Sequence, residues 1–176
     1  PFHFAAPDAY SGTNAPIAGM LATASKAMGF VAMMRVLVGF AAPNEAVTAW
    51  APALGVLAII TMTWGNLAAL SSENPKRMLA YSSVAHAGYM LAAIAAVGSG
   101  LADTESEELI VTAVLFHLCV LVVFKMGPFL ILSSLDREGS SHSMTGLHGL
   151  SSRDPLLAGS MFVFMLSLAG VPPFSG

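Results

Sequence analysis

Apolar residues fill five long segments of the 176-residue chain, at approximately 15–40, 52–70, 78–97, 108–132 and 155–171. Each segment is close to the roughly 17–25 residues that a helix needs to cross a bilayer. Backbone groups in lipid must bond within the protein, so we expect helices and exclude an open sheet. The pattern therefore predicts an all-α, polytopic membrane protein with about five transmembrane helices.

The connecting segments carry turn-forming and helix-breaking residues. They read AAPNEA, SSENPKR, GSGLADTESEE and DREGSSHSMTGLHGLSSRDP. Pro16, Pro52 and Pro155 would lie in the first turns of the helices that follow, where a missing N–H costs little. We therefore expect residues 1–176 to form a single transmembrane domain.

Composition supports the membrane assignment and narrows the chemistry. Hydrophobic residues make up 56% of the chain and charged residues only 10%, whereas a soluble domain is nearer a quarter charged. The net charge is −3 and no basic patch is present, which argues against nucleic acid as a partner. The single cysteine, Cys119, cannot hold an iron–sulfur cluster, and His142 and His148 show no metal-ligand spacing. We expect no cofactor and no metal on this chain.

Lysine and arginine in the loops indicate an orientation. The loops on one side contain Lys76, Arg77, Arg137 and Arg153, whereas loops 41–51 and 98–107 contain neither residue type. The positive-inside rule therefore places loops 71–77 and 133–154 in the cytoplasm. The chain begins with Pro1 and ends in VPPFSG directly after an apolar run, so we also expect an internal fragment of a longer protein.

A few ionisable residues lie inside the apolar segments: Lys26, Arg35, His86, His117 and Lys125. Lys26 would lie about 15 Å along a helix about 37 Å long, too deep for its side chain to reach the membrane surface. A lysine at mid-membrane costs about 2.5–3.5 kcal/mol on insertion scales, and such residues usually serve a function. The alternative is a structural ion pair.

The fourth apolar segment contains FHLCVLVVFKMGPFLIL. His117 and Lys125 are eight residues apart, which is about 12 Å along a helix and 80° around it. One water molecule, or one side chain from a neighbouring helix, could bridge that gap. Pro128 is expected to kink this helix and admit water. His117 could instead be a structural core histidine, and His86 is as well suited to structure as to conduction.

A buried lysine can exchange its proton near neutral pH, whereas an arginine stays charged. Lys26, His117 and Lys125 therefore favour a proton relay over a passive membrane scaffold, which has no reason to bear their insertion cost. All carboxylates of the chain lie in loops or at helix edges. The acid that sets the charge of these lysines is therefore expected outside this sequence.

Three stretches carry a family resemblance: PFHFAAPDAYSGTNAPIAGMLATASKAMGF, GNLAALSSENPKRMLAYSSVAHAGYML and PLLAGSMFVFMLSLAGVPPFSG. They resemble signatures of the antiporter-like membrane subunit N of respiratory complex I, the proton-pumping NADH:quinone oxidoreductase. The resemblance covers nearly the whole chain in the right order. It implies the middle of a larger antiporter-like helix bundle of about fourteen helices, with the five segments here as helices eight to twelve and Pro1–Tyr10 as the end of a broken seventh.

The resemblance also implies a mechanism and partners. Lys26 matches the eighth-helix lysine of a mid-membrane proton path, and His117 and Lys125 would continue that path, with His86 a weaker candidate. NADH, FMN, iron–sulfur clusters and quinone would be bound by partner subunits. The expected partners of this chain are other membrane subunits of the complex, the lipid bilayer and protons. The expected location is the bacterial plasma membrane.

Two departures from the family pattern stand out. Ala5 replaces the usual tryptophan after PFHF, and HLCVLVVFK is closer to the HLxxHxxFK pattern of the sister L-type and M-type subunits, with Leu121 in place of the second histidine. A sister subunit of the same complex therefore stays an alternative, as does a subunit of a multisubunit cation/proton antiporter.

Overall fold

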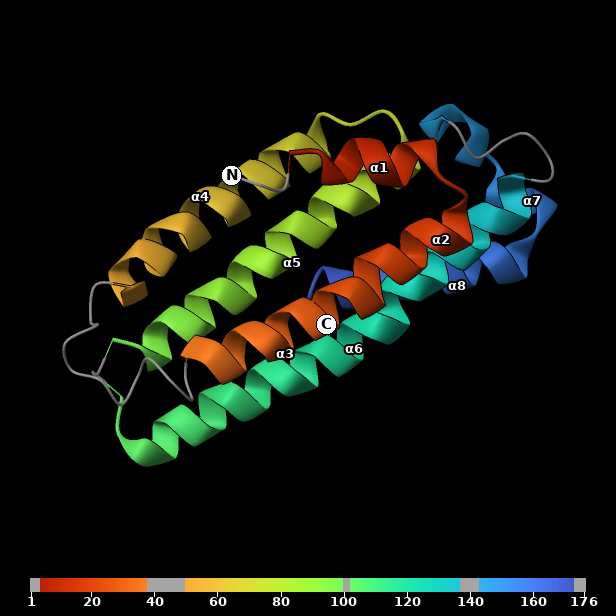
Figure 1. The fold of residues 1–176 in the computed structure, drawn as a ribbon. Coiled ribbons are helices and arrows are strands. Elements are labelled where there is room, and N and C mark those ends of the chain that lie inside the picture. Colours follow the sequence, from red (N-terminus) through yellow and green to blue (C-terminus); the bar gives the residue numbers. More distant parts are fainter. Residues whose placement is uncertain (1–3, 38–49, 100–101, 137–142, 173–176) are drawn as a thin grey trace.

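The computed structural model describes residues 4–37, 50–99, 102–136 and 143–172. Four stretches of it are long helices: α2–η1–α3, α4, α5 and α6 (Figure 1). Their bounds are Ala15–Met20 for α2, Leu21–Ser25 for the π-helix η1, Lys26–Val36 for α3, Trp50–Leu70 for α4, Pro75–Val97 for α5 and Thr104–Asp136 for α6. The shorter elements are α1 (Ala6–Gly12), η4 (Met144–Leu147), α7 (Leu150–Arg153) and α8 (Pro155–Leu168).

The predicted fold class is confirmed over the described residues. The chain there is helical, and four helices are long and apolar enough to cross a membrane: Ala15–Val36, Trp50–Leu70, Pro75–Val97 and Thr104–Asp136. The helices α5 and α6 extend beyond the expected segments 78–97 and 108–132 at one or both ends. Residues 38–40 of the first expected segment lie outside the described residues.

Side-chain caps fix where two of these helices begin. The Asn74 side chain accepts hydrogen bonds from the backbone N–H groups of Lys76 and Arg77 at the start of α5. Asp154 does the same for Leu156 and Leu157 at the start of α8. Each cap is followed directly by a proline at the first helical position, which has no N–H to satisfy.

The helices α4 and α5 form a tight antiparallel pair (Figure 1). A Cβ added at Gly65 would lie 2.7 Å from the backbone nitrogen of Ala85, and one added at Gly88 would lie 2.7 Å from that of Met62. Membrane helices lack a hydrophobic force to bring them together, and small residues allow the close backbone approach that dispersion requires. These two glycines therefore set the spacing of α4 and α5.

The core lies where α2, η1 and α3 pack against α5 and α6. One cluster includes Ala18, Ala22, Leu79, Phe129 and Leu132. A second cluster lies further along the same helices and includes Phe30, Met34, Met90, Ile94 and Leu118. In both clusters the helical stretch α2–η1–α3 packs against α5 and α6, so these two helices hold it along its length.

The helix α8 is 14 residues long, shorter than the expected segment 155–171. At 1.5 Å per residue it measures about 21 Å, less than the roughly 30 Å of a hydrocarbon core. Its end is a Schellman motif: Val171 N–H bonds to the carbonyl of Leu166, and Gly170 N–H to that of Ser167. Gly170 takes the left-handed conformation this ending needs, with φ of 71°.

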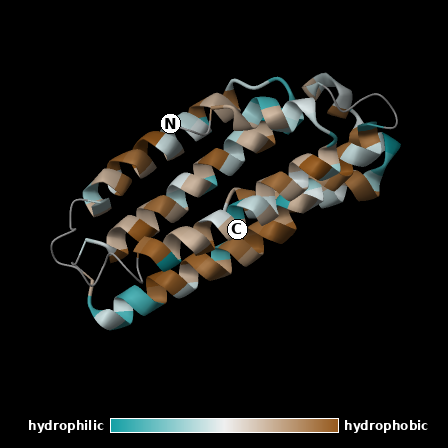
Figure 2. Ribbon diagram, viewed as in Figure 1, coloured by the Kyte–Doolittle hydropathy of each residue, from teal (hydrophilic) through white to brown (hydrophobic). Residues whose placement is uncertain are grey.

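Polar residues gather at the ends of the bundle. Hydrophobic colours dominate the long helices, while the start of α6 at the lower left is hydrophilic (Figure 2). At the opposite end, Lys76 of α5 pairs with Asp136 of α6 at 3.0 Å, and Arg77 pairs with Asp8 of α1 at 2.7 Å. These ion pairs join the ends of α1, α5 and α6.

Candidate functional site

Lys26 is the first residue of α3, and its side chain reaches across to α5. Its Nζ donates to the backbone oxygen of Ser83 at 2.5 Å and to Ser83 Oγ at 2.6 Å. The residue lies 11 positions into the helical stretch that begins at Ala15, which is roughly 16 Å. The amine is therefore held deep within the apolar length of the helix.

A π-helix directly precedes Lys26. It comprises Leu21–Ser25, flanked by α2 and α3 on a continuous helical path. Inside it, Thr23 Oγ1 donates to the carbonyl of Gly19 at 2.9 Å. Single π-helical turns are rare and are frequent at functional sites. The apolar pattern of this segment gave no sign of it.

Lys125 is almost completely buried on α6, at 1% exposure. Its Nζ donates to Ser82 Oγ of α5 at 2.7 Å. Three residues further on, α6 continues as a helix through Pro128, which is itself buried. The expected entry of water at Pro128 stays a prediction.

The two histidines meet between α5 and α6. His86 Nδ1 lies 3.3 Å from His117 Nε2, and the ring centroids are 5.4 Å apart. The ring of Tyr89 packs edge-on against His86, and its hydroxyl accepts a hydrogen bond from Asn66 at 3.0 Å. His86 is buried and His117 half-buried. One ring must donate and the other accept, so the pair can share one proton.

All four predicted residues thus converge on one stretch of α5. Lys26 and Lys125 bond to the adjacent residues Ser83 and Ser82, and His117 bonds to His86. His117 and Lys125 are therefore each joined to α5, but through different residues, His86 and Ser82, so the single bridging side chain considered in the sequence analysis stays a prediction. His86 also lies in this cluster; the sequence alone leaves open whether it serves structure or proton conduction.

The two serines were missed by the sequence analysis. Ser82, Ser83 and His86 occupy positions i, i+1 and i+4 of the otherwise apolar α5. Polar groups at this spacing lie within about 100° of one another around a helix. That spacing could have revealed the serines, because hydroxyl residues close to a histidine on an apolar helix indicate that one face of the helix is polar.

The lysines of the cluster have no carboxylate partner within the described part of the chain. The ion pairs found there join Lys76 to Asp136 and Arg77 to Asp8, both at the end of the bundle. The site is built from amines and imidazoles, which can gain and lose protons, and from hydroxyls, which donate and accept hydrogen bonds. No three histidine, cysteine, aspartate or glutamate residues in the described ranges are grouped where they could hold a metal ion.

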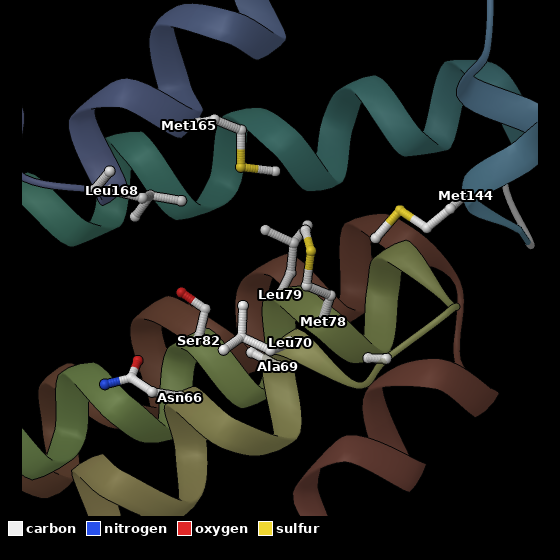
Figure 3. A pocket seen from close by; sticks show the side chains of 11 residues that line it. Asn66, Ala69, Leu70, Met78, Leu79, Ser82, Met144, Met165 and Leu168 are labelled. Carbon is white, nitrogen blue, oxygen red and sulfur yellow. The ribbon is translucent and has the colours of Figure 1, made fainter.

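A cavity of about 580 Å³ adjoins this cluster between α4, α5 and α8. Asn66 of α4 and Ser82 of α5 line one part of it, and Met144 and Met165 line another. Figure 3 shows the Ser82 hydroxyl directed away from its own helix into this space. The acceptor of the Lys125 amine therefore borders open volume.

Comparison with known proteins identifies the family. Residues 1–176 match the family described as NADH:quinone oxidoreductase/Mrp antiporter, transmembrane. The chain belongs to this family. It is 47% identical over 179 residues to NADH-quinone oxidoreductase subunit N 2 of Roseiflexus castenholzii, and 42% identical over 176 residues to subunit N of Heliobacterium modesticaldum. Subunit N of Rubrobacter xylanophilus is 43% identical over 176 residues.

These matches cover all of the chain but only 34–35% of each relative. The chain thus spans about a third of the length of the curated relatives it matches. The family resemblance inferred from the three sequence stretches is confirmed, and the relatives named here are all N-type subunits.

Proposed function

We propose that this chain is part of a proton-translocating membrane subunit, N-type, of an NADH:quinone oxidoreductase. The observation that carries the proposal is the meeting of Lys26 and Lys125 on adjacent residues of α5, beside the His86–His117 pair. Protons would pass along this mid-membrane cluster, driven by redox chemistry in partner subunits. The names of the relatives favour this function over a cation/proton antiporter of the same family.

The remaining assignments follow from that proposal. NADH, FMN, iron–sulfur clusters and quinone would belong to partner subunits, and this chain would carry no redox chemistry. Its partners would be other membrane subunits of the complex. It would lie in a bacterial plasma membrane, with loops 71–77 and 133–154 in the cytoplasm, which the positive-inside rule supports.

The test is a set of Lys26 variants in the complete complex, reconstituted into sealed vesicles. Lys26→Ala should reduce proton pumping and coupled quinone reduction at least tenfold, because the amine that exchanges the proton is gone. Lys26→Arg keeps the charge but should fail as well, since a guanidinium does not release its proton at working pH. Lys125→Ala should give a similar but milder loss if His117 and His86 carry protons past it.

The matched control is Arg35→Ala, which removes an exposed cation from the same helix and should pump as the native complex does. Pumping at the native rate by Lys26→Arg would show that Lys26 is a structural counter-charge, and the relay would then be wrong.

A further inference from the structure

Two consecutive serines of α5 receive the two buried amines from different helices. Ser83 accepts from Lys26 of α3, and Ser82 accepts from Lys125 of α6. Consecutive residues of a helix point about 100° apart, so one dipeptide can face two neighbouring helices at once. No other helix in the described part of the chain hydrogen-bonds both lysines.

The two lysines depend on their serines to different extents. Lys26 has two acceptors on Ser83, and one of them is a backbone oxygen that no substitution removes. Lys125 is 1% exposed, and among the described residues its Nζ has a single acceptor, Ser82 Oγ. Loss of the Ser82 hydroxyl would therefore leave the three donors of this buried ammonium group without an acceptor among the described residues.

A hydroxyl suits an amine that gains and loses a proton. It accepts a hydrogen bond from an ammonium group, and by rotating its O–H it donates to the lone pair of a neutral amine. A carbonyl can only accept. Ser82 can therefore hold Lys125 in the same place in both protonation states.

We propose that Ser82 and Ser83 are positioning residues that hold Lys125 and Lys26 for proton transfer through α5, with Ser82 the more critical of the two. This inference rests on the proposed function and deepens it. It assigns α5 a part in the path that goes beyond its histidine.

The cavity beside Ser82 makes a shape-matched test possible. Ser82 is half-buried and lines the space of about 580 Å³, so a β-branched side chain has room there. Threonine and valine have nearly the same shape and differ in the hydroxyl. Ser83 is 2% exposed and offers no such room, so alanine is the suitable replacement at that position.

The experiment measures the rate of proton pumping, the protons pumped per electron and the rate of NADH oxidation, for complete complexes in sealed vesicles. Ser82→Thr should pump at least tenfold faster than Ser82→Val, because a lost hydrogen bond to a charged group corresponds to roughly ten- to hundredfold. Ser82→Ala should behave like Ser82→Val, and serves in its place if the valine variant does not assemble. Ser83→Ala should lose less than Ser82→Ala, because the backbone acceptor of Lys26 remains.

The control is Ser134→Ala on α6, whose hydroxyl donates to the carbonyl of Ile131 in its own helix and should not affect pumping. Equal pumping by Ser82→Thr and Ser82→Val would overturn the inference. If Lys26→Ala and Lys125→Ala still reduce pumping in that case, the proposed function stands. If those lysine variants also pump normally, the proposed function falls together with the inference.

Discussion

Replacing Gly65 with alanine tests how closely α4 and α5 must approach. The added Cβ would lie 2.7 Å from the backbone nitrogen of Ala85 and 3.0 Å from its Cα. Ordinary contact begins near 3.4 Å, so the helices must move apart by about 0.7 Å (3.4 minus 2.7) at this point. Backbone atoms cannot rotate away as a side chain would. Such overpacking costs typically about 1–3 kcal/mol.

Gly55 of the same helix provides the control. A Cβ there meets nothing within 4 Å. Both substitutions gain the same helix propensity, about 0.8–1 kcal/mol, so this gain cancels when they are compared. Gly65→Ala should therefore be less stable than Gly55→Ala by about 1–3 kcal/mol.

The same interface allows a sharper test with Gly88, whose added Cβ would lie 2.7 Å from the backbone nitrogen of Met62. A single separation of α4 from α5 relieves both clashes. The double variant Gly65→Ala/Gly88→Ala should therefore cost less than the sum of the single variants.

The measurement is the free energy of unfolding of the complete protein in detergent, from denaturant titrations of all four variants. Equal stability of Gly65→Ala and Gly55→Ala would show that the helices are not in close contact at this point. Full additivity in the double variant would show that the two glycines act separately.

Two further predictions concern the ends of the bundle. Asp136→Asn removes the carboxylate that pairs with Lys76, whose ammonium is buried at 4% exposure, and this loss should destabilise the fold by about 3–5 kcal/mol. Lys76→Met instead leaves the Asp136 carboxylate, which is 26% exposed and which water can reach. Asp136→Asn should thus unfold at a lower temperature than Lys76→Met. The opposite order would show that the Lys76 ammonium is not the more deeply buried partner. In a background with Cys119 replaced, a cysteine at Ser72 should react with an impermeant reagent from the cytoplasm and one at Asp103 from outside; the reverse would refute the orientation.

Much of the fold followed from the sequence because its cause is local. A membrane-length run of apolar residues has to be helical in lipid, so the positions of α4, α5 and α6 could be predicted without knowledge of their neighbours. Lys26 and Lys125 could be chosen as candidate site residues for the same reason, because a lysine in such a run is costly wherever the other helices lie.

The contacts of the site could not be predicted, because they depend on how the helices pack. The approach of Lys26 to Ser83, rather than to another residue of α5, depends on how α3 and α5 are rotated relative to each other. The π-helix Leu21–Ser25 reads LATAS, and nothing in these small apolar and hydroxyl residues distinguishes it from an α-helical turn. The end of α8 at Leu168 differs from the expected 171 because the hydropathy of Ala169 and Val171 hides the turn at Gly170.

The short helix α8 also bears on how the protein is made. A helix of 14 residues is too short to be released sideways from the insertion machinery as a complete membrane span. Its backbone leaves the helical path at Gly170, where the Schellman motif satisfies the carbonyl groups of Leu166 and Ser167 within the protein. We therefore expect α8 to be stably inserted only when it packs against α6, where Phe164 lies against Gly127. Its insertion would then depend on packing against α6 rather than on hydrophobicity alone.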